Sequence, residues 1–343
     1  MGFVLDLPWA AVRTFGLEAR HGFNQTSART FALDALKSAA LGAALLPPLG
    51  AGLSAILARS GPHVALQLWA LLSAVSLALV WAHPALIAPL FNTFSPLPEG
   101  SLRARIEALA ADVRFPLKKL FVVDGSARSA HSNAYMFGFG RNKRVVLYDT
   151  LLQQCSEDQI LAVLAHELGH WKLRHTVVLF LAAQLQLGAT LALFTALRTL
   201  PGLAESFGFG AGGGARGPLR LGFDSVLHAW LRADGARPRE SWRVDPAHVP
   251  ALAALLLLPQ LMGPLDAALG CLSRLVSRAF EYQADAFAAD RGLAEDLQAA
   301  LITLDKENKS APHADALYSA VHHSHPTLLQ RLRALETRAK KRL

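Results

Sequence analysis

Charged residues are scarce in this sequence. Asp, Glu, Lys and Arg together make up 17% of its 343 residues, whereas ordinary soluble domains contain about 25%. Apolar residues make up 52%, and the mean hydropathy is positive at +0.28. This balance argues against an ordinary soluble protein and indicates that lipid is the solvent for part of the chain.

Several other features are missing. The two cysteines, Cys155 and Cys271, form neither a disulfide framework nor a metal-binding pair. No positively charged region precedes the apolar residues of the N-terminus, so a secretory signal is not expected. The net charge is +8, but no nucleic-acid motif accompanies it, and we expect no nucleic-acid partner. Basic loops beside membrane spans explain the charge better.

What the sequence does have is long apolar runs. Four are long enough to cross a bilayer, which takes roughly 20 helical residues, and they cover residues 39–58, 64–91, 176–197 and 249–271. Prolines inside such runs, as at positions 47, 48, 259 and 264, are tolerated in spanning helices. Buried helices of a large soluble core are the alternative, but four such runs in a chain of 343 residues argue against it. We therefore expect a mainly α, multi-span helical membrane protein.

The apolar runs divide the chain into four expected regions. Residues 1–91 form an N-terminal membrane region with two spans, and residues 92–175 form a soluble catalytic part. Residues 176–271 contain two further spans with a Gly-rich loop at about 201–246, and residues 272–343 form C-terminal catalytic helices. Four spans place the two catalytic regions on the same side of the membrane.

A metal-binding pattern occurs at His166-Glu-Leu-Gly-His170. Residues four apart share one helix face, so both imidazoles can bind one zinc ion while Glu167 lies beside it as the general base. A capping box from Ser156 to Gln159 predicts that this helix begins just upstream. Two surface histidines on a solvated helix are the alternative, but the residues before the pattern are apolar.

A catalytic zinc site needs a third protein ligand and an open position. His175 does not fit, because it comes one residue early for the metzincin pattern and Leu173 occupies the glycine position. Glu281 is the better candidate, on a long helix that continues from the last apolar run. Asp285 shares its face and can orient a ligand histidine through the other ring nitrogen. Without the upstream pattern, this carboxylate pair would indicate only a solvated face.

Taken together, the sequence resembles the type I CAAX prenyl proteases, which are membrane zinc endopeptidases that process farnesylated proteins. The resemblance extends from about residue 18 to about residue 335. It is carried by these segments: residues 18–24, 89–92, 96–100, 131–135, 142–150, 166–170, 281–285, 324–326 and 331–332.

The resemblance implies an all-α membrane body that encloses a chamber, with a short β-hairpin beside a gluzincin-like site for one zinc ion per chain. It implies cleavage after the prenylated cysteine of a CAAX sequence, which removes the C-terminal tripeptide. His325 would then stabilise the tetrahedral intermediate, and Arg331 would support it. The expected partners are a prenylated CAAX protein or peptide and membrane lipid. Family members usually carry further spanning helices upstream of the segment that this chain begins with.

The resemblance also assigns Asn133, Ala134 and Tyr135 to a strand beside the cleft. The residues themselves predict such a strand, since strand-like runs at 134–139 and 144–148 flank a plausible hairpin turn. A free strand edge can bind an extended peptide through main-chain hydrogen bonds. For the side chain of Tyr135, ordinary packing explains the pattern equally well.

The last four residues, Lys340-Lys-Arg-Leu343, match a dilysine signal for retrieval to the endoplasmic reticulum. A basic end of the last helix is the alternative. We expect a multi-pass protein of that membrane, with the catalytic side and the C-terminus facing the cytosol. Lys and Arg are about equally frequent on the two sides per residue, so they do not decide the orientation.

Two other functions remain open. One is a general membrane quality-control zinc protease, which would share the zinc pattern but not the segments 92–100 and 131–135. The other is a non-enzymatic membrane scaffold or transporter, which the complete set of zinc residues disfavours.

Overall fold

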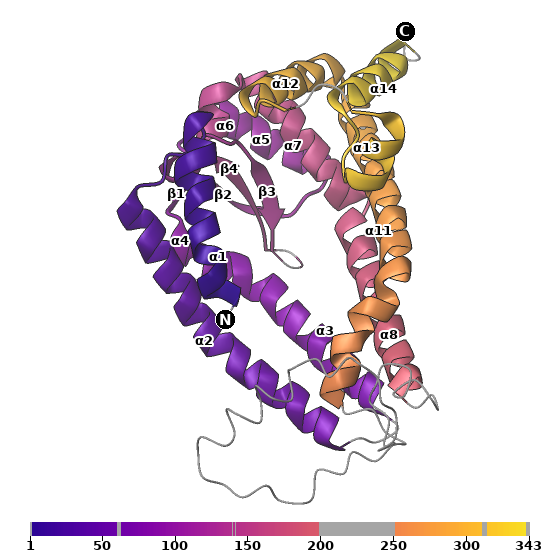
Figure 1. The fold of residues 1–343 in the computed structure, drawn as a ribbon. Helices are drawn as coiled ribbons and strands as arrows, with labels where there is room; N and C mark the ends of the chain where they lie inside the picture. The colour runs from indigo at the N-terminus through magenta and orange to yellow at the C-terminus, as the bar shows by residue number, and fades with distance from the viewer. Residues whose placement is uncertain are drawn as a thin grey trace, which may run out of the picture. The chain divides into compact units, whose positions relative to one another are not determined.

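The computed structural model describes residues 2–59, 63–138, 140, 142–198, 251–310 and 314–340 (Figure 1). The Gly-rich loop expected at about 201–246 and the last three residues of the dilysine signal lie outside these ranges. The chain divides into two compact units, which are described separately. The first comprises Met1–Ser54, Leu71–Gln184 and Leu265–Leu343, and the second comprises Ala55–Ala70 and Leu185–Pro264.

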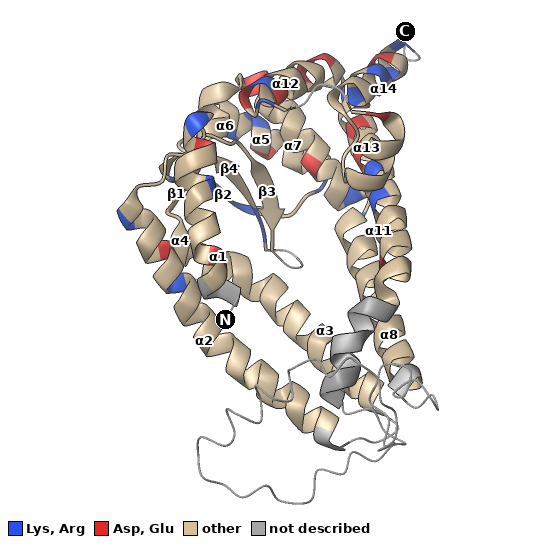
Figure 2. Cartoon of the chain, viewed as in Figure 1, with Lys and Arg blue, Asp and Glu red and all other residues tan. Residues whose placement is uncertain are grey.

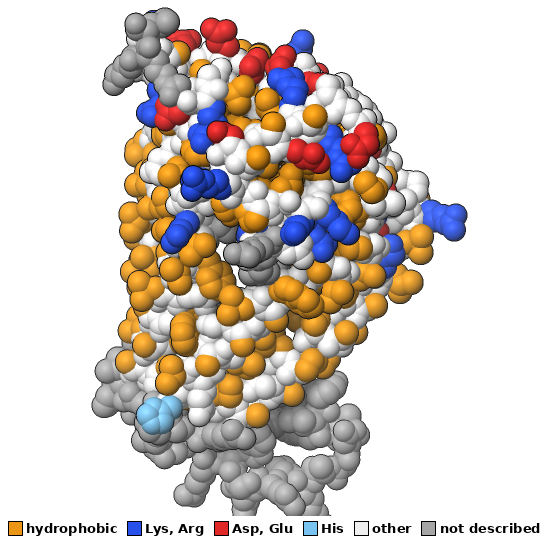
Figure 3. All heavy atoms as spheres, turned by 180° about the vertical axis from the view of Figure 1, so that it is seen from behind, with side chains coloured by type: hydrophobic (Ala, Val, Ile, Leu, Met, Phe, Trp, Pro, Cys, Tyr) orange, Lys and Arg blue, Asp and Glu red, His pale blue; other side chains and the backbone are white. Residues whose placement is uncertain are grey.

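Three described helical segments are long and apolar enough to cross a membrane, namely Ala28–Leu57, Val64–Phe91 and His175–Ala196. The first follows the short α1 (Gly2–Ala11) and the π-helical η1 (Val12–Glu18). The segments correspond to α2 (Ala28–Arg59), to α3 (Val64–Ala82) with η2 (His83–Ile87) and α4 (Ala88–Phe91), and to α8 (His175–Arg198). Large apolar side chains on these helices are exposed, and Figure 3 shows many apolar side chains on one face of the molecule. That exposure suits lipid rather than water.

The fourth expected span falls at the start of α11 (Ala251–Ala289). Its side chains up to residue 261 lie outside the described part of the chain. The helix runs without a break from this apolar stretch to the expected third ligand, which confirms the prediction of one long helix. In the second unit, the described core consists of apolar side chains from α3, α8 and α11: Val64, Leu68, Leu191, Phe194 and Met262.

A mixed four-stranded sheet lies in the first unit, with the strand order β1-β2-β4-β3. The strands are β1 (Phe94–Pro96), β2 (Leu117–Val123), β3 (Ala134–Phe137) and β4 (Lys143–Tyr148). β3 and β4 pair antiparallel, which confirms the predicted hairpin, whereas β2 and β4 pair parallel. The hairpin is therefore half of a sheet whose other strands the sequence analysis did not identify. Within the described residues, β3 has no strand partner on its outer edge.

Helices α5 (Ser101–Asp112), α6 (Asp149–Gln154) and α7 (Glu157–Lys172) pack with this sheet. Three consecutive residues of β4, Val145 to Leu147, are buried, so both faces of that strand are covered. The capping box of α7 forms as predicted: the Ser156 hydroxyl accepts a hydrogen bond from the Gln159 backbone, and the Gln159 side chain accepts one from the Ser156 backbone. The start of the helix that bears the histidines is thereby set locally.

Small residues bring α7 against α11. Ala162 and Ala165 of α7 pack with Ala288 and Ala289 of α11 in a buried cluster that also includes residues of α12 (Ala294–Glu307) and α14 (Leu328–Lys340). A Cβ atom at Gly169 would lie 3.1 Å from the Ala284 Cα, which is tighter than ordinary packing. The glycine inside the His-Glu pattern therefore permits the close approach of the two helices. Charged side chains concentrate on the sheet and these helices and are rare along the long apolar helices (Figure 2).

Candidate functional site

His166, His170 and Glu281 converge where α7 meets α11. Their donor atoms all lie within 4.8 Å of one another, the one such group of three found among the described residues. The two histidine Nε2 atoms are 3.1 Å apart. Glu281 Oε2 lies 3.5 Å from His166 Nε2, and Glu281 Oε1 lies 3.5 Å from His170 Nε2. Glu281, which is 111 positions from His170 in the sequence, thus points its carboxylate at the two histidines.

These separations fit a single metal ion. Three donors held about 2.0–2.2 Å from one tetrahedral metal lie roughly 3.3–3.6 Å from one another. Two of the observed distances are 3.5 Å, inside that range, and the third is 3.1 Å, slightly below it. Two imidazoles and one carboxylate are a donor set suited to a catalytic metal centre.

Asp285 and Arg331 contact the residues of the cluster. Asp285 is 2% exposed, and its Oδ1 accepts a hydrogen bond from His166 Nδ1 at 2.9 Å. Arg331, on α14, donates to both oxygens of Asp285, at 2.9 and 2.5 Å. Its Nη1 also lies 3.6 Å from Glu281 Oε2. The structure therefore brings both expected supporting residues to the histidine and the carboxylate of the cluster.

The electrostatic environment shifts the pKa values of the two histidines in opposite directions. Burial alone would lower the pKa of His166, but hydrogen bonds to Asp285 and Glu281 raise it to about 8. Burial, followed by the neighbouring charge of His166, lowers the pKa of His170 to about 4. The pKa of Asp285 is lowered although burial opposes this, because His166 and Arg331 donate to the ionised carboxylate. Burial raises the pKa of Glu167 above its ordinary value, which makes its carboxylate a better proton acceptor.

His325 reaches the cluster from the loop between α13 (Ala316–His322) and α14. Its Nε2 lies 3.3 Å from Glu281 Oε1, and its side chain is 63% exposed. The buried Arg278 holds this loop: Arg278 donates to the His325 carbonyl oxygen at 3.0 Å and to the Gln330 side chain at 2.9 Å. Arg278 was missed by the sequence analysis, and its one sequence signal is its position three residues before Glu281 on the same helix.

The expected substrate-binding residues lie at the start of the outer strand β3. Its neighbour α7 carries the histidines, and β3 lies beside it (Figure 1). Ala134 is buried, and its backbone N–H donates to the Asn133 side chain at 2.8 Å. The Tyr135 ring packs near Tyr148, with 6.3 Å between centroids, and burial raises the pKa of Tyr135 to about 12. The tyrosine hydroxyl is therefore protonated at physiological pH.

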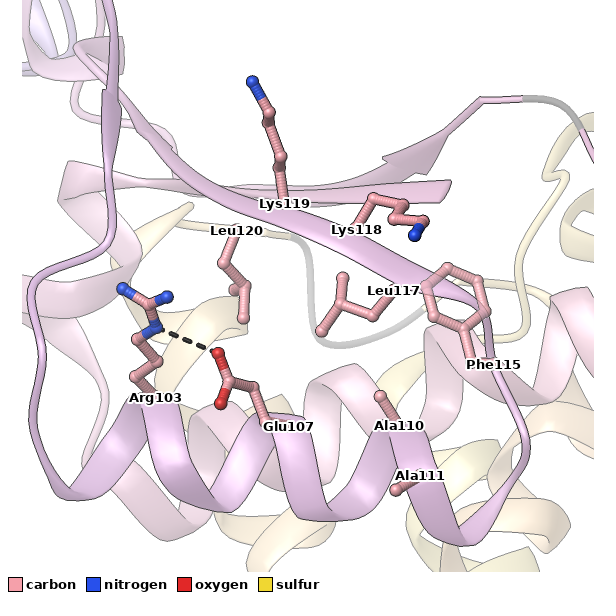
Figure 4. Close-up of a pocket in the computed structure, with 9 residues that line it drawn as sticks. All are labelled: Arg103, Glu107, Ala110, Ala111, Phe115, Leu117, Lys118, Lys119 and Leu120. Carbon is pink, nitrogen blue, oxygen red and sulfur yellow. Dashed lines mark hydrogen bonds and ion pairs between the residues drawn. The ribbon is translucent and has the colours of Figure 1, made fainter. Parts of the chain in front are cut away.

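A separate pocket of about 220 Å³ opens between α5 and β2 (Figure 4). Arg103 and Glu107, which are hydrogen-bonded to each other at 2.9 Å, lie on its helical wall. Lys118 and Lys119 lie on its strand wall. No residue of this pocket belongs to the histidine cluster, so it adds nothing to the candidate site.

Comparison with known proteins identifies the family. The sequence profile of peptidase family M48 matches residues 96–339, and a profile described as "CAAX prenyl protease N-terminal, five membrane helices" matches residues 1–93. The CAAX prenyl protease 1 homolog of Arabidopsis thaliana is 45% identical over 98% of this chain and 71% of its own length. The homolog of Homo sapiens is 37% identical over 96% and 70%, respectively.

A solved structure shares the fold. The crystal structure of S. mikatae Ste24p superposes with a TM-score of 0.82 at 36% identity, covering 98% of this chain and 73% of that one. The likeness therefore includes the helical membrane body as well as the elements around the histidines. By sequence and by fold, this chain belongs to the CAAX prenyl proteases of peptidase family M48, which are multi-pass membrane metalloendopeptidases.

Proposed function

We propose that this chain is a zinc-dependent endopeptidase that removes the C-terminal tripeptide from prenylated CAAX proteins. The observation that carries the proposal is the convergence of His166, His170 and Glu281, with Glu167 on the same turn of α7, in a chain of this family. The donor set of two imidazoles and one carboxylate favours zinc, since magnesium and calcium prefer sites made of oxygens alone. One zinc ion per chain would complete the site.

The residues around the cluster have different roles in hydrolysis. Zinc, when bound, polarises the scissile carbonyl and lowers the pKa of water. Glu167 accepts a proton from the attacking water, whose oxygen bonds to the carbonyl carbon. Glu167 then passes that proton to the nitrogen of the breaking C–N bond, which yields a carboxylic acid and a free amine. His325 donates a hydrogen bond to the oxygen on which negative charge develops, a contribution typically worth about 10²- to 10³-fold in rate.

Substrate recognition in this proposal has two parts. The outer edge of β3, beginning at Asn133, Ala134 and Tyr135, would hold the extended CAAX tail by main-chain hydrogen bonds. The apolar membrane helices would take up the prenyl chain, since each buried methylene contributes roughly 0.8 kcal/mol. Main-chain pairing tolerates variable side chains in the tail, whereas the lipid supplies affinity.

A peptide assay tests the substrate. Purified protein with zinc is expected to cut a farnesylated CAAX peptide on the carboxyl side of the cysteine and to leave the unfarnesylated peptide largely intact, because the unmodified peptide lacks the buried methylenes. Mass spectrometry of the products locates the cut, and a Glu167→Gln preparation reports contaminating proteases. Equal cutting of both peptides, at scattered bonds, would favour the quality-control protease instead.

We further propose that the protein resides in the endoplasmic-reticulum membrane with the site and the C-terminus facing the cytosol. The proposal rests on the family, since prenylated tails are trimmed at the cytosolic face of that membrane, and on the four expected spans, which place residues 92–175 and 272–343 on the same side. A tag fused after Leu343 is expected to be digested when sealed microsomes are treated with protease. A tag that stays protected until detergent is added would reverse the orientation.

A further inference from the structure

His175 lies against the side of His170 that faces away from the cluster. The Nε2 atom of His170 points toward His166 and Glu281, and its Nδ1 atom lies 3.0 Å from His175 Nδ1. His175 is 2% exposed. A buried imidazole whose ring nitrogen contacts a candidate ligand, without itself joining the donor group, needs a role of its own.

Two further contacts hold the His175 ring. It stacks on Phe280, with 4.0 Å between ring centroids and 2° between the ring planes. Its Nε2 atom lies 3.0 Å from the side-chain oxygen Oε1 of Gln283. Phe280 and Gln283 belong to α11, which also bears Glu281, so the helix that supplies the carboxylate also fixes the orientation of His175.

The proton positions along this chain of contacts follow from metal binding. If His170 binds metal through Nε2, its one ring proton sits on Nδ1, because a neutral imidazole carries a single N–H. That N–H can only donate, so His175 Nδ1 must accept. The proton of His175 is then on Nε2, from which it donates to Gln283 Oε1. Metal binding by His170 therefore leaves one possible set of donors and acceptors along His170, His175 and Gln283.

We propose that His175 is a positioning residue for the metal: it accepts a hydrogen bond from His170 and so fixes the tautomer and the ring orientation in which His170 binds zinc, with Gln283 fixing His175 in turn. Partners of this kind usually are carboxylates or carbonyl oxygens, and their loss typically weakens metal binding about 10- to 100-fold. Asp285 serves His166 in the corresponding way. The inference rests on the proposed metal-binding role of His170.

The turn between α7 and α8 explains why His175 can reach His170. Arg174 has a φ of 60°, in the left-handed region that few residues other than glycine adopt. This reversal lets His175, the first residue of α8, turn back toward the last turn of α7. Its position five residues after His170 would not place it on the same face of a continuous helix.

The test measures the zinc dissociation constant of the full-length protein in detergent by competition with a chromophoric chelator. His175→Phe keeps a ring that can stack on Phe280 but removes the acceptor, and it should weaken zinc binding about 10- to 100-fold. His175→Asn loses the ring but places an amide oxygen near the former Nδ1 position, and it should bind zinc within a few-fold of wild type. Gln283→Glu, at an exposed position, offers only acceptors to His175 and should not weaken binding.

The outcomes separate the inference from the proposal beneath it. Wild-type affinity in His175→Phe, or equal weakening in His175→Phe and His175→Asn, would overturn the positioning role, and so would tenfold weaker binding in Gln283→Glu. Failure of the wild-type protein to bind zinc would instead overturn the proposed metal site. Melting temperatures without metal verify that each variant is folded.

Discussion

Glu167→Gln is expected to lower kcat by about 10²- to 10⁴-fold while zinc binding and folding stay unchanged. The amide fits the same space but cannot accept the proton of the attacking water. Glu167 follows His166 on α7 and its charged form is disfavoured by burial, which raises its pKa. A carboxylate in that environment is a stronger base than one in water, so its replacement should lower kcat strongly.

The measurement compares turnover of a prenylated CAAX peptide with metal content in the same preparations. Glu157→Gln is a matched control, since it makes the same chemical change on the same helix at a position whose side chain is 44% exposed. This control should retain wild-type turnover. Should Glu167→Gln keep more than a few per cent of wild-type turnover, another group would have to act as the base.

Glu281→Ala is expected to lose stoichiometric zinc and, with it, activity. The substitution leaves two imidazoles, and a catalytic zinc site needs three protein ligands. It also removes the carboxylate that lies 3.6 Å from Arg331 Nη1. Metal analysis after dialysis measures the loss directly, and Glu295→Ala, at an exposed position on α12, serves as the control.

A comparison with His175 makes this prediction sharper. His175→Ala should still carry zinc when the metal is supplied in excess, because a residue that only orients a ligand changes the affinity without changing the number of ligands. Zinc retained by Glu281→Ala but lost by His175→Ala, both in excess metal, would reverse the assignment of the third ligand.

The sequence by itself determined the features that depend on local chain geometry. His166 and His170 share a helix face because the α-helix repeats every 3.6 residues, and the capping box at Ser156 sets where that helix begins. The apolar runs predict membrane helices because a backbone in lipid must satisfy its hydrogen bonds internally. The β3–β4 hairpin likewise follows from two strand-like runs around a short turn.

The tertiary structure alone decided how the distant segments meet. β2 pairs directly with β4 in parallel although β3 lies between them in the sequence, and neither segment encodes this pairing in its own pattern. Gly169 matters because α11 passes within van der Waals distance of it, and Arg278 matters because it holds the loop of His325. Spacing in the sequence excludes His175 as a ligand. It cannot predict the contact of His175 with Gln283, which lies 108 positions away. Such contacts are set by the packing distance between helices and by one backbone reversal at Arg174, and neither leaves a periodic signal in the sequence.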